Sequence, residues 1–100
     1  MPFSQPLPRS FTEISIRNHA PALPGVYGIS NSTEWIYIGE CDNIQQALLE
    51  HLLEVNTPLL IRHPTGFVFE ICDWLKRSAR QDQLIFEYEP RCNRHWSRRA

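Results

Sequence analysis

The stretch that decides the fold is Pro24-Gly25-Val26-Tyr27, which is followed ten residues after its tyrosine by Tyr37-Ile38-Gly39. Both runs contain residues that favour strands, and Asn31 to Glu34 between them is typical of a turn. These features predict a β-hairpin whose two strands carry the two tyrosines. Tyr27 and Tyr37 share one face of this hairpin only if they pair directly or through a bulge, which a turn of even length would not give.

Two helices are predicted on either side of the hairpin. Ser10-Phe11-Thr12-Glu13 has the form of a capping box and predicts a helix of two turns before Pro21. After the hairpin, Asp42 has the character of an N-cap, and apolar residues then recur at helical spacing. We therefore expect a second helix over about residues 43–55, with its apolar side packed on the hairpin.

The second half of the chain predicts one more strand and one more long helix. Residues 66–72 alternate in the manner of a strand, with Phe67 and Phe69 on one face. Residues 74–88 predict a helix that Pro90 ends. The predicted fold class is α+β, a small domain with a three-stranded antiparallel sheet and flanking helices.

The composition is that of a compact globular protein. The chain has 100 residues, of which 42% are hydrophobic, and this suits a single core. We divide it into a Pro-rich N-terminal segment with a short helix over residues 1–24, a compact domain over 25–93 and a basic C-terminal tail over 94–100. No apolar run approaches the ~20 residues of a membrane span, and no signal-peptide pattern opens the chain. We expect a cytoplasmic protein with no membrane partner.

The cysteines predict neither a disulfide framework nor a zinc site. Cys41, Cys72 and Cys92 are odd in number and show no C-x-x-C spacing. Cys92 and His95 have a C-x-x-H spacing, but a second pair at a suitable distance is absent from the sequence. We expect reduced thiols and no structural metal.

Charge is distributed unevenly along the chain. Residues 1–75 hold three arginines and eight acidic residues, whereas residues 76–100 hold seven Lys or Arg and three acidic residues. Because phosphate affinity comes mostly from Lys and Arg, any nucleic acid would be attracted to the C-terminal end. The candidate nucleic-acid-binding residues are Arg91, Arg94, Trp96, Arg98 and Arg99, although a solvated tail explains the same pattern.

Several motifs taken together resemble the GIY-YIG nuclease superfamily, and in particular the N-terminal nuclease module of bacterial excision-repair enzymes. The two tyrosine triplets are followed by Asn43-Ile44 at a helix start, by His51 inside that helix, and by a closing block from Gln83 to Asn93. The resemblance runs from about Pro24 to Asn93. It implies that two tyrosines line the site, that a first-helix arginine stabilises the charged transition state, and that a second-helix glutamate holds a divalent metal.

Carried over residue by residue, the resemblance gives an incomplete active site. The positions of the predicted vestigial cleft are Tyr27, Tyr37, Ala47, His51, Gln81 and Asn93. Tyr27, Tyr37, His51 and Asn93 match the family pattern. The arginine position holds Ala47 and the glutamate position holds Gln81. In addition, Glu40 stands where many members of the family carry a lysine or another non-acidic residue.

Neighbouring residues offer few replacements for the lost groups. Asp82 is one step from Gln81, but one step along a helix turns the side chain by about 100°. Glu50 and Glu54 lie near the lost arginine, and Arg77 or Arg80 is a candidate cation from the second long helix. Ordinary structural roles also account for the matching residues. Buried tyrosines are common in strands, and a partly buried histidine often forms a hydrogen bond in the core. Asn93 is as suited to bracing the backbone of a turn as to binding a ligand.

We therefore expect a nuclease-like domain that has lost its activity and acts as a binding or regulatory module. The alternative is a metal-dependent DNA endonuclease whose active site has been rearranged or engineered out. No cofactor is expected in the first case, whereas the second requires Mg²⁺ or Mn²⁺. A nucleic acid or a protein is the expected kind of partner, and the sequence does not choose between them.

Overall fold

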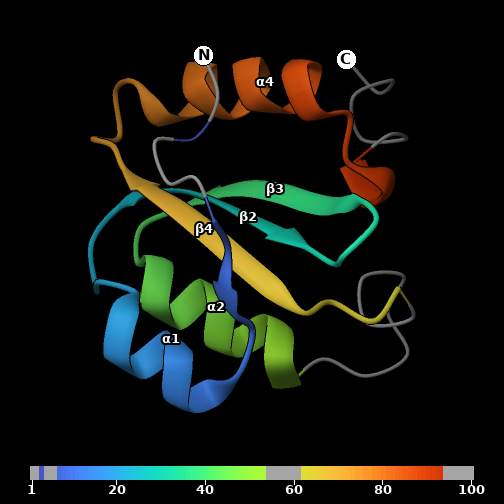
Figure 1. Ribbon diagram of the computed structural model, residues 1–100. Helices are drawn as coiled ribbons and strands as arrows, with labels where there is room; N and C mark the ends of the chain where they lie inside the picture. The colour runs from blue at the N-terminus through green and yellow to red at the C-terminus, as the bar shows by residue number, and fades with distance from the viewer. Residues whose placement is uncertain (1–2, 4–6, 54–61, 94–100) are drawn as a thin grey trace.

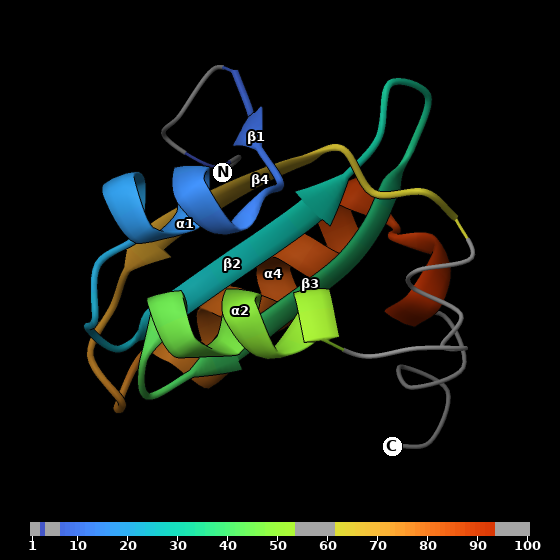
Figure 2. The same cartoon turned by 90° about the horizontal axis from the view of Figure 1, so that it is seen from below.

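The computed structural model describes residue 3, residues 7–53 and residues 62–93, and within them an α+β fold in three layers. The strands are β1 (Arg9–Ser10), β2 (Gly25–Ser30), β3 (Trp35–Cys41) and β4 (Gly66–Ile71), and the helices are α1 (Glu13–His19), α2 (Ile44–Leu53), α4 (Arg77–Tyr88) and the 3₁₀ helix η1 (Arg91–Asn93). All the strand pairs are antiparallel, in the order β1-β4-β2-β3. Helices α1 and α2 cover one face of the sheet and α4 covers the other (Figure 1; Figure 2).

The sheet has four strands, so the prediction of three is wrong. The additional strand is β1, in which Arg9 pairs with Phe67 and Ser10 with Gly66 at the free side of β4. A Cβ atom on Gly66 would lie 2.7 Å from the Cβ of Pro8, so the glycine allows this close approach. A strand of two residues inside a Pro-rich segment has no alternation to reveal it in the sequence.

A β-bulge places the two motif tyrosines on one face of the sheet. Tyr27 pairs with Gly39 and Ile29 pairs with Tyr37, but the next pair is Ser30 with Trp35. Ile36 is therefore the extra residue, and it packs in the same core cluster that Tyr37 contacts. The bulge compensates for the even turn length that stood against this arrangement.

Local hydrogen bonds set the starts of the helices. Thr12 caps α1, because its Oγ1 accepts a bond of 3.2 Å from the amide of Ser15. The cap of α2 is Asn43, whose Oδ1 accepts a 2.9 Å bond from the amide of Gln46, so the assignment of this cap to Asp42 is wrong. Helix α4 starts later than the predicted residue 74, because the Asp73 carboxylate accepts backbone amides and holds residues 74–76 in a turn.

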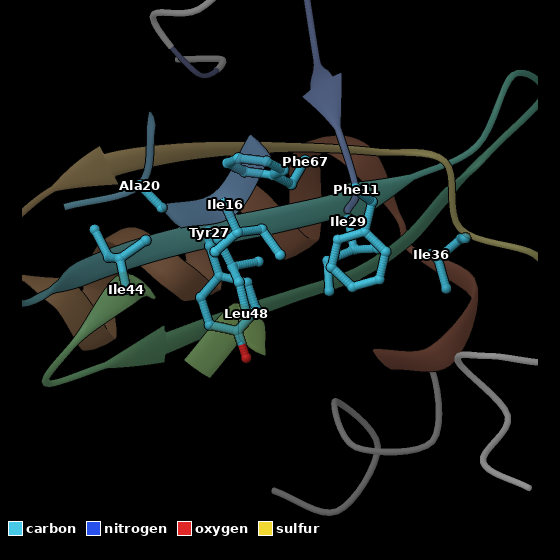
Figure 3. Close-up of a cluster of buried hydrophobic side chains, with 9 residues drawn as sticks. All are labelled: Phe11, Ile16, Ala20, Tyr27, Ile29, Ile36, Ile44, Leu48 and Phe67. Carbon is cyan, nitrogen blue, oxygen red and sulfur yellow. The ribbon is translucent and has the colours of Figure 1, made fainter. Parts of the chain in front are cut away.

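Two apolar clusters hold the layers together. The first lies between the sheet and helices α1 and α2, and Figure 3 shows its buried members, which are Phe11, Ile16, Ala20, Tyr27, Ile29, Ile36, Ile44, Leu48 and Phe67. The second lies under α4 and consists of Phe3, Val26, Ile38, Val68 and Leu84. The strands β2 and β3 thus contribute to both cores, which fixes the position of the hairpin between the helices.

Candidate functional site

Three aromatic side chains from different elements meet on the α2 face of the sheet. Tyr27 comes from β2, Tyr37 from β3 and His51 from α2, and their ring centroids are 5.3 to 6.1 Å apart. The hydroxyl of Tyr27 lies 2.7 Å from Nε2 of His51, which is a hydrogen bond. Tyr27 is only 4% exposed, whereas Tyr37 and His51 are half-buried. We call these three residues the aromatic cluster.

Gly39 makes room for the aromatic cluster. It lies directly opposite Tyr27 in the hairpin and two residues after Tyr37. A Cβ atom at this position would stand 2.8 Å from Cε2 of Tyr37 and 2.9 Å from the hydroxyl oxygen of Tyr27. Only a glycine therefore lets both rings lie across the strand without displacement. The glycine of the second triplet has a packing role that the motif alone does not reveal.

Ala47 lies one helical turn before His51 and faces the same side of α2. Its methyl group packs against the first core cluster, as does the ring of Tyr37. The helix thus presents a small apolar group beside the aromatic cluster at the position where the family resemblance puts a cation.

Arg77 on α4 contacts the C-terminal end of β3. Its Nη2 lies 2.6 Å from Oδ1 of Asp42, its Nη1 donates a 2.7 Å bond to the carbonyl oxygen of Cys41, and its Nε lies 3.2 Å from Oε1 of Glu40. The Nε contact is an ion pair without hydrogen-bond geometry. The hydrogen bond to the Asp42 carboxylate raises the pKa of the Arg77 guanidinium. We call Arg77, Glu40 and Asp42 the ion-pair cluster.

Gln81 approaches β3 from the opposite face to α2. Helix α4 runs antiparallel to β3, because Arg77 contacts Cys41 at one end while Tyr88 packs 4.5 Å from Trp35 at the other. Gln81 is half-buried and lies one turn beyond Arg77 on the same side of the helix. Asn93 belongs to η1, and the position of its side chain is outside the described part of the structure.

The other proposed replacements for the missing groups point elsewhere or are engaged. Arg80 forms two bonds of 2.8 and 2.9 Å with the carboxylate of Glu70. Asp82 and Glu50 are exposed, and Glu50 accepts a bond from the side chain of Gln46. Glu54 lies outside the described residues.

The donor set at this site does not fit a divalent cation. Hard cations such as Mg²⁺ prefer carboxylates, and the glutamate position of the family holds the neutral amide of Gln81. Glu40 and Asp42, the carboxylates at the C-terminal end of β3, already pair with Arg77. In the described ranges, no three His, Cys, Asp or Glu side chains come close enough together to hold a metal ion.

The candidate nucleic-acid-binding residues lie at the other end of the hairpin, as far as the structure describes them. Arg91 pairs with Glu34 at 3.3 Å, and Arg62 pairs with the same carboxylate at 3.3 Å. Arg94, Trp96, Arg98 and Arg99 fall outside the described residues, and so does His95 of the C-x-x-H spacing. Sequence reasoning missed this pairing because Arg62 and Glu34 meet only in the folded chain.

The thiols near these sites are protonated groups of the core. Burial raises the pKa of Cys41 and of Cys92, and Cys41 lies 3.7 Å from the carbonyl oxygen of Gly25. All three cysteines of the chain are free. A helix of the length and apolarity that a membrane crossing needs is absent from the described residues.

Comparisons with known proteins show which proteins share this fold. No family model matches the chain. A stretch of 41 residues is 44% identical to the UvrABC system protein C of Hydrogenobaculum sp. (strain Y04AAS1), and it spans 41% of this chain but 7% of that protein.

Solved structures match over a larger part of the chain. The GIY-YIG N-terminal endonuclease domain of UvrC from Thermotoga maritima, bound to magnesium, superposes with a TM-score of 0.65 at 25% identity, over 78% of this chain and 94% of that one. A point mutant of the same domain, bound to its catalytic divalent cation, gives a TM-score of 0.65 at 25% identity, over 78% of this chain and 93% of that one. The chain therefore has the fold of these endonuclease domains.

Proposed function

We propose that this GIY-YIG domain, which is related to the N-terminal endonuclease domain of UvrC, has given up phosphodiester hydrolysis and acts as a binding or regulatory module. The observation that carries the proposal is the ion-pair cluster. Arg77 is one of the two candidate replacements for the family's arginine, and its guanidinium is occupied by Glu40, Asp42 and the carbonyl of Cys41. The other candidate, Arg80, pairs with Glu70, so within the described residues both candidate cations are engaged by carboxylates.

The chemistry of the reaction explains why this loss is severe. Hydrolysis of a phosphodiester needs an activated water, a Lewis acid on the phosphate oxygens and a cation for the developing charge. Removal of one group that stabilises transition-state charge typically lowers the rate by ~10² to 10³. Here the substitution at Ala47 removes the cation and the substitution at Gln81 removes the carboxylate that would hold the metal, so both losses combine.

The retained part of the site supports a binding role. Tyr27, Tyr37 and His51 keep a packed arrangement that Gly39 accommodates, and two of these rings remain half-exposed. We assign the ligand to the α2 face of the sheet beside Tyr27, Tyr37, Ala47 and His51, and its class to a nucleic acid end, a small molecule or a protein segment. Arg91, with Arg94, Trp96, Arg98 and Arg99, is the proposed extension for a nucleic acid.

A nuclease assay tests the loss of activity. The purified chain is incubated with single-stranded, nicked and branched DNA in the presence of Mg²⁺ or Mn²⁺, and we expect no cleavage above background. Metal-dependent turnover would establish the alternative, an endonuclease with a rearranged site.

Restoration of the two charges tests whether the domain has lost only its catalytic groups and still binds DNA. The double substitution Ala47→Arg with Gln81→Glu should produce metal-dependent cleavage if the cleft still accepts DNA. The matched control is Ala79→Arg with Gln83→Glu, which makes the same charge change at exposed positions of α4. Equal cleavage by both double variants would mean that general charge, and not the site, is responsible.

A further inference from the structure

Helix α4 and the turn before it carry a line of exposed residues, mostly apolar, on the side that faces away from the sheet. Leu75 lies in the turn before the helix, and Ala79, Asp82 and Phe86 follow at spacings of four, three and four residues, which places them in line along one side. Leu75 is 72% exposed and Phe86 is 86% exposed. We call these four residues the outer stripe. Figure 1 shows that α4 forms an outermost layer of the fold.

The outer stripe is additional to the core-facing side of the same helix. Leu84 is buried under α4, and Ile85 and Tyr88 pack beside it. A helix at the surface of a globular protein normally carries a single apolar side, and the opposite side is polar. Next to the start of the stripe, Trp74 is 70% exposed and extends the apolar surface. Exposed apolar residues that occur together in this way mark interaction surfaces.

The charges around the outer stripe are mostly negative. Asp82 lies within it, and the exposed residues Asp73, Glu87 and Glu89 lie one to three positions beyond its ends along the chain. The two arginines of α4 are turned inward, since Arg77 pairs with Glu40 and Asp42 and Arg80 pairs with Glu70. Lys76, the N-cap residue directly before the helix, is an exposed cation. Such a surface repels nucleic acid and also repels a second copy of itself.

We propose that the outer stripe is the docking surface for a cationic amphipathic helix of a partner protein. The spacing of Leu75, Ala79 and Phe86 matches the anchor spacing by which one helix packs along another. Asp82 and the acidic residues around the stripe complement Lys or Arg on the partner and set its orientation. This surface belongs to α4 and is separate from the aromatic cluster, so the inference holds whether or not the domain cleaves DNA.

A designed peptide provides the test. The probe is a 14-residue helix with leucines at positions i, i+3, i+4 and i+7 and with lysines on its other side, and its partner probe carries glutamates in place of the lysines. Binding to the full chain is measured by isothermal titration calorimetry at low and at physiological salt. We expect the lysine probe to bind at least tenfold more tightly than the glutamate probe, with an advantage that shrinks as salt rises.

Variants locate the bound peptide. Leu75→Ser and Phe86→Ser should each weaken binding of the lysine probe about tenfold, as expected for central apolar anchors. The matched controls are Ile14→Ser and Leu53→Ser, which remove apolar side chains that are 75% and 82% exposed on the other side of the sheet. Circular dichroism confirms that each variant is folded. Equal losses in the controls, equal binding of the two probes, or a dimer held together through Phe86 would each overturn the inference.

Discussion

The two sides of the β2–β3 hairpin are held by different kinds of contact. On the α2 face, Tyr27, Tyr37 and His51 form a packed cluster above Gly39, as a functional site of this fold would require. At the end of β3 next to α4, an arginine and two acids form ion pairs among themselves. The comparison shows that packing holds the residues of the α2 face together, whereas charge holds those at the end of β3. Tyr27 contributes to the stability of the fold, whereas a catalytic arginine contributes mainly to the reaction.

The largest expected effect is on the α2 face of the hairpin, where the aromatic cluster packs. Tyr27→Ala removes an almost fully buried ring and should lower the free energy of unfolding by about 3–5 kcal/mol, as for other large aromatic truncations. Tyr27→Phe is the matched control, because it removes only the hydroxyl that bonds to His51, and it should cost about 0.5–1.5 kcal/mol. Urea denaturation measures both. Equal losses in the two variants would mean that the hydrogen bond, and not the ring, makes Tyr27 indispensable.

A smaller loss is expected at Gly39. Gly39→Ala introduces a methyl group into contacts of 2.8 and 2.9 Å with the two tyrosines, and overpacking of this kind costs about 1–3 kcal/mol. The combination with Tyr37→Ala should cost less than the sum of the two single changes, because one of the obstacles is then absent. Strict additivity would show that the strain lies in the backbone of the hairpin.

Much of the packed side could be predicted from the sequence, because its signals are local. The tyrosine triplets and the turn between them specify the hairpin, and the apolar spacing after Asn43 specifies α2. The bulge at Ile36 could not be located from the sequence, because it depends on how Ile36 and Tyr37 pack against the first core cluster in the folded chain. Strand β1 was missed for a similar reason, because its pairing depends on the contact between Pro8 and Gly66.

The contacts of the ion-pair cluster were less predictable from the sequence. Motif spacing predicts that Ala47 and Gln81 occupy the family's arginine and glutamate positions, and this assignment stays a prediction. The partners of Arg77 could not be predicted, because Glu40 and Asp42 are remote in sequence and are brought to Arg77 only when α4 packs antiparallel to β3. Glu40 has the wrong sign for a phosphate site, and its pairing with Arg77 explains its presence.

The ion-pair cluster predicts a third effect, smaller than that of Gly39→Ala. Arg77→Met should lower the melting temperature by a modest amount, since Asp42 is well exposed and solvent screens the pair. Part of the loss should return when Glu40→Gln and Asp42→Asn are added, because the unpaired carboxylates are then removed. The single variant Arg80→Met is the control at the neighbouring ion pair. No recovery would mean that Arg77 acts through its packing.

The same cluster can be converted into a metal site. Arg77→Met with Gln81→Glu should place Glu40, Asp42 and the new carboxylate at one edge of β3, an oxygen-rich set suited to Mn²⁺. We expect Mn²⁺ to raise the melting temperature of this double variant and to leave the unmodified chain unchanged. An equal shift in the unmodified chain would contradict the conclusion that the present residues do not fit a divalent cation.

The smallest effect concerns pH and the two thiols, Cys41 and Cys92, that pack against the first core cluster. Burial raises the pKa of Cys41 and Cys92 in the folded chain above the value of 9.0 for an unperturbed thiol. Because the folded state then holds these protons more strongly than the unfolded state, the thiols contribute stability below about pH 9 that is lost as the pH rises through the folded pKa. Urea midpoints between pH 8 and pH 10 should therefore fall more steeply for the unmodified chain than for Cys41→Ala with Cys92→Ala. Parallel curves would show that Lys76 and the tyrosines alone produce the alkaline loss.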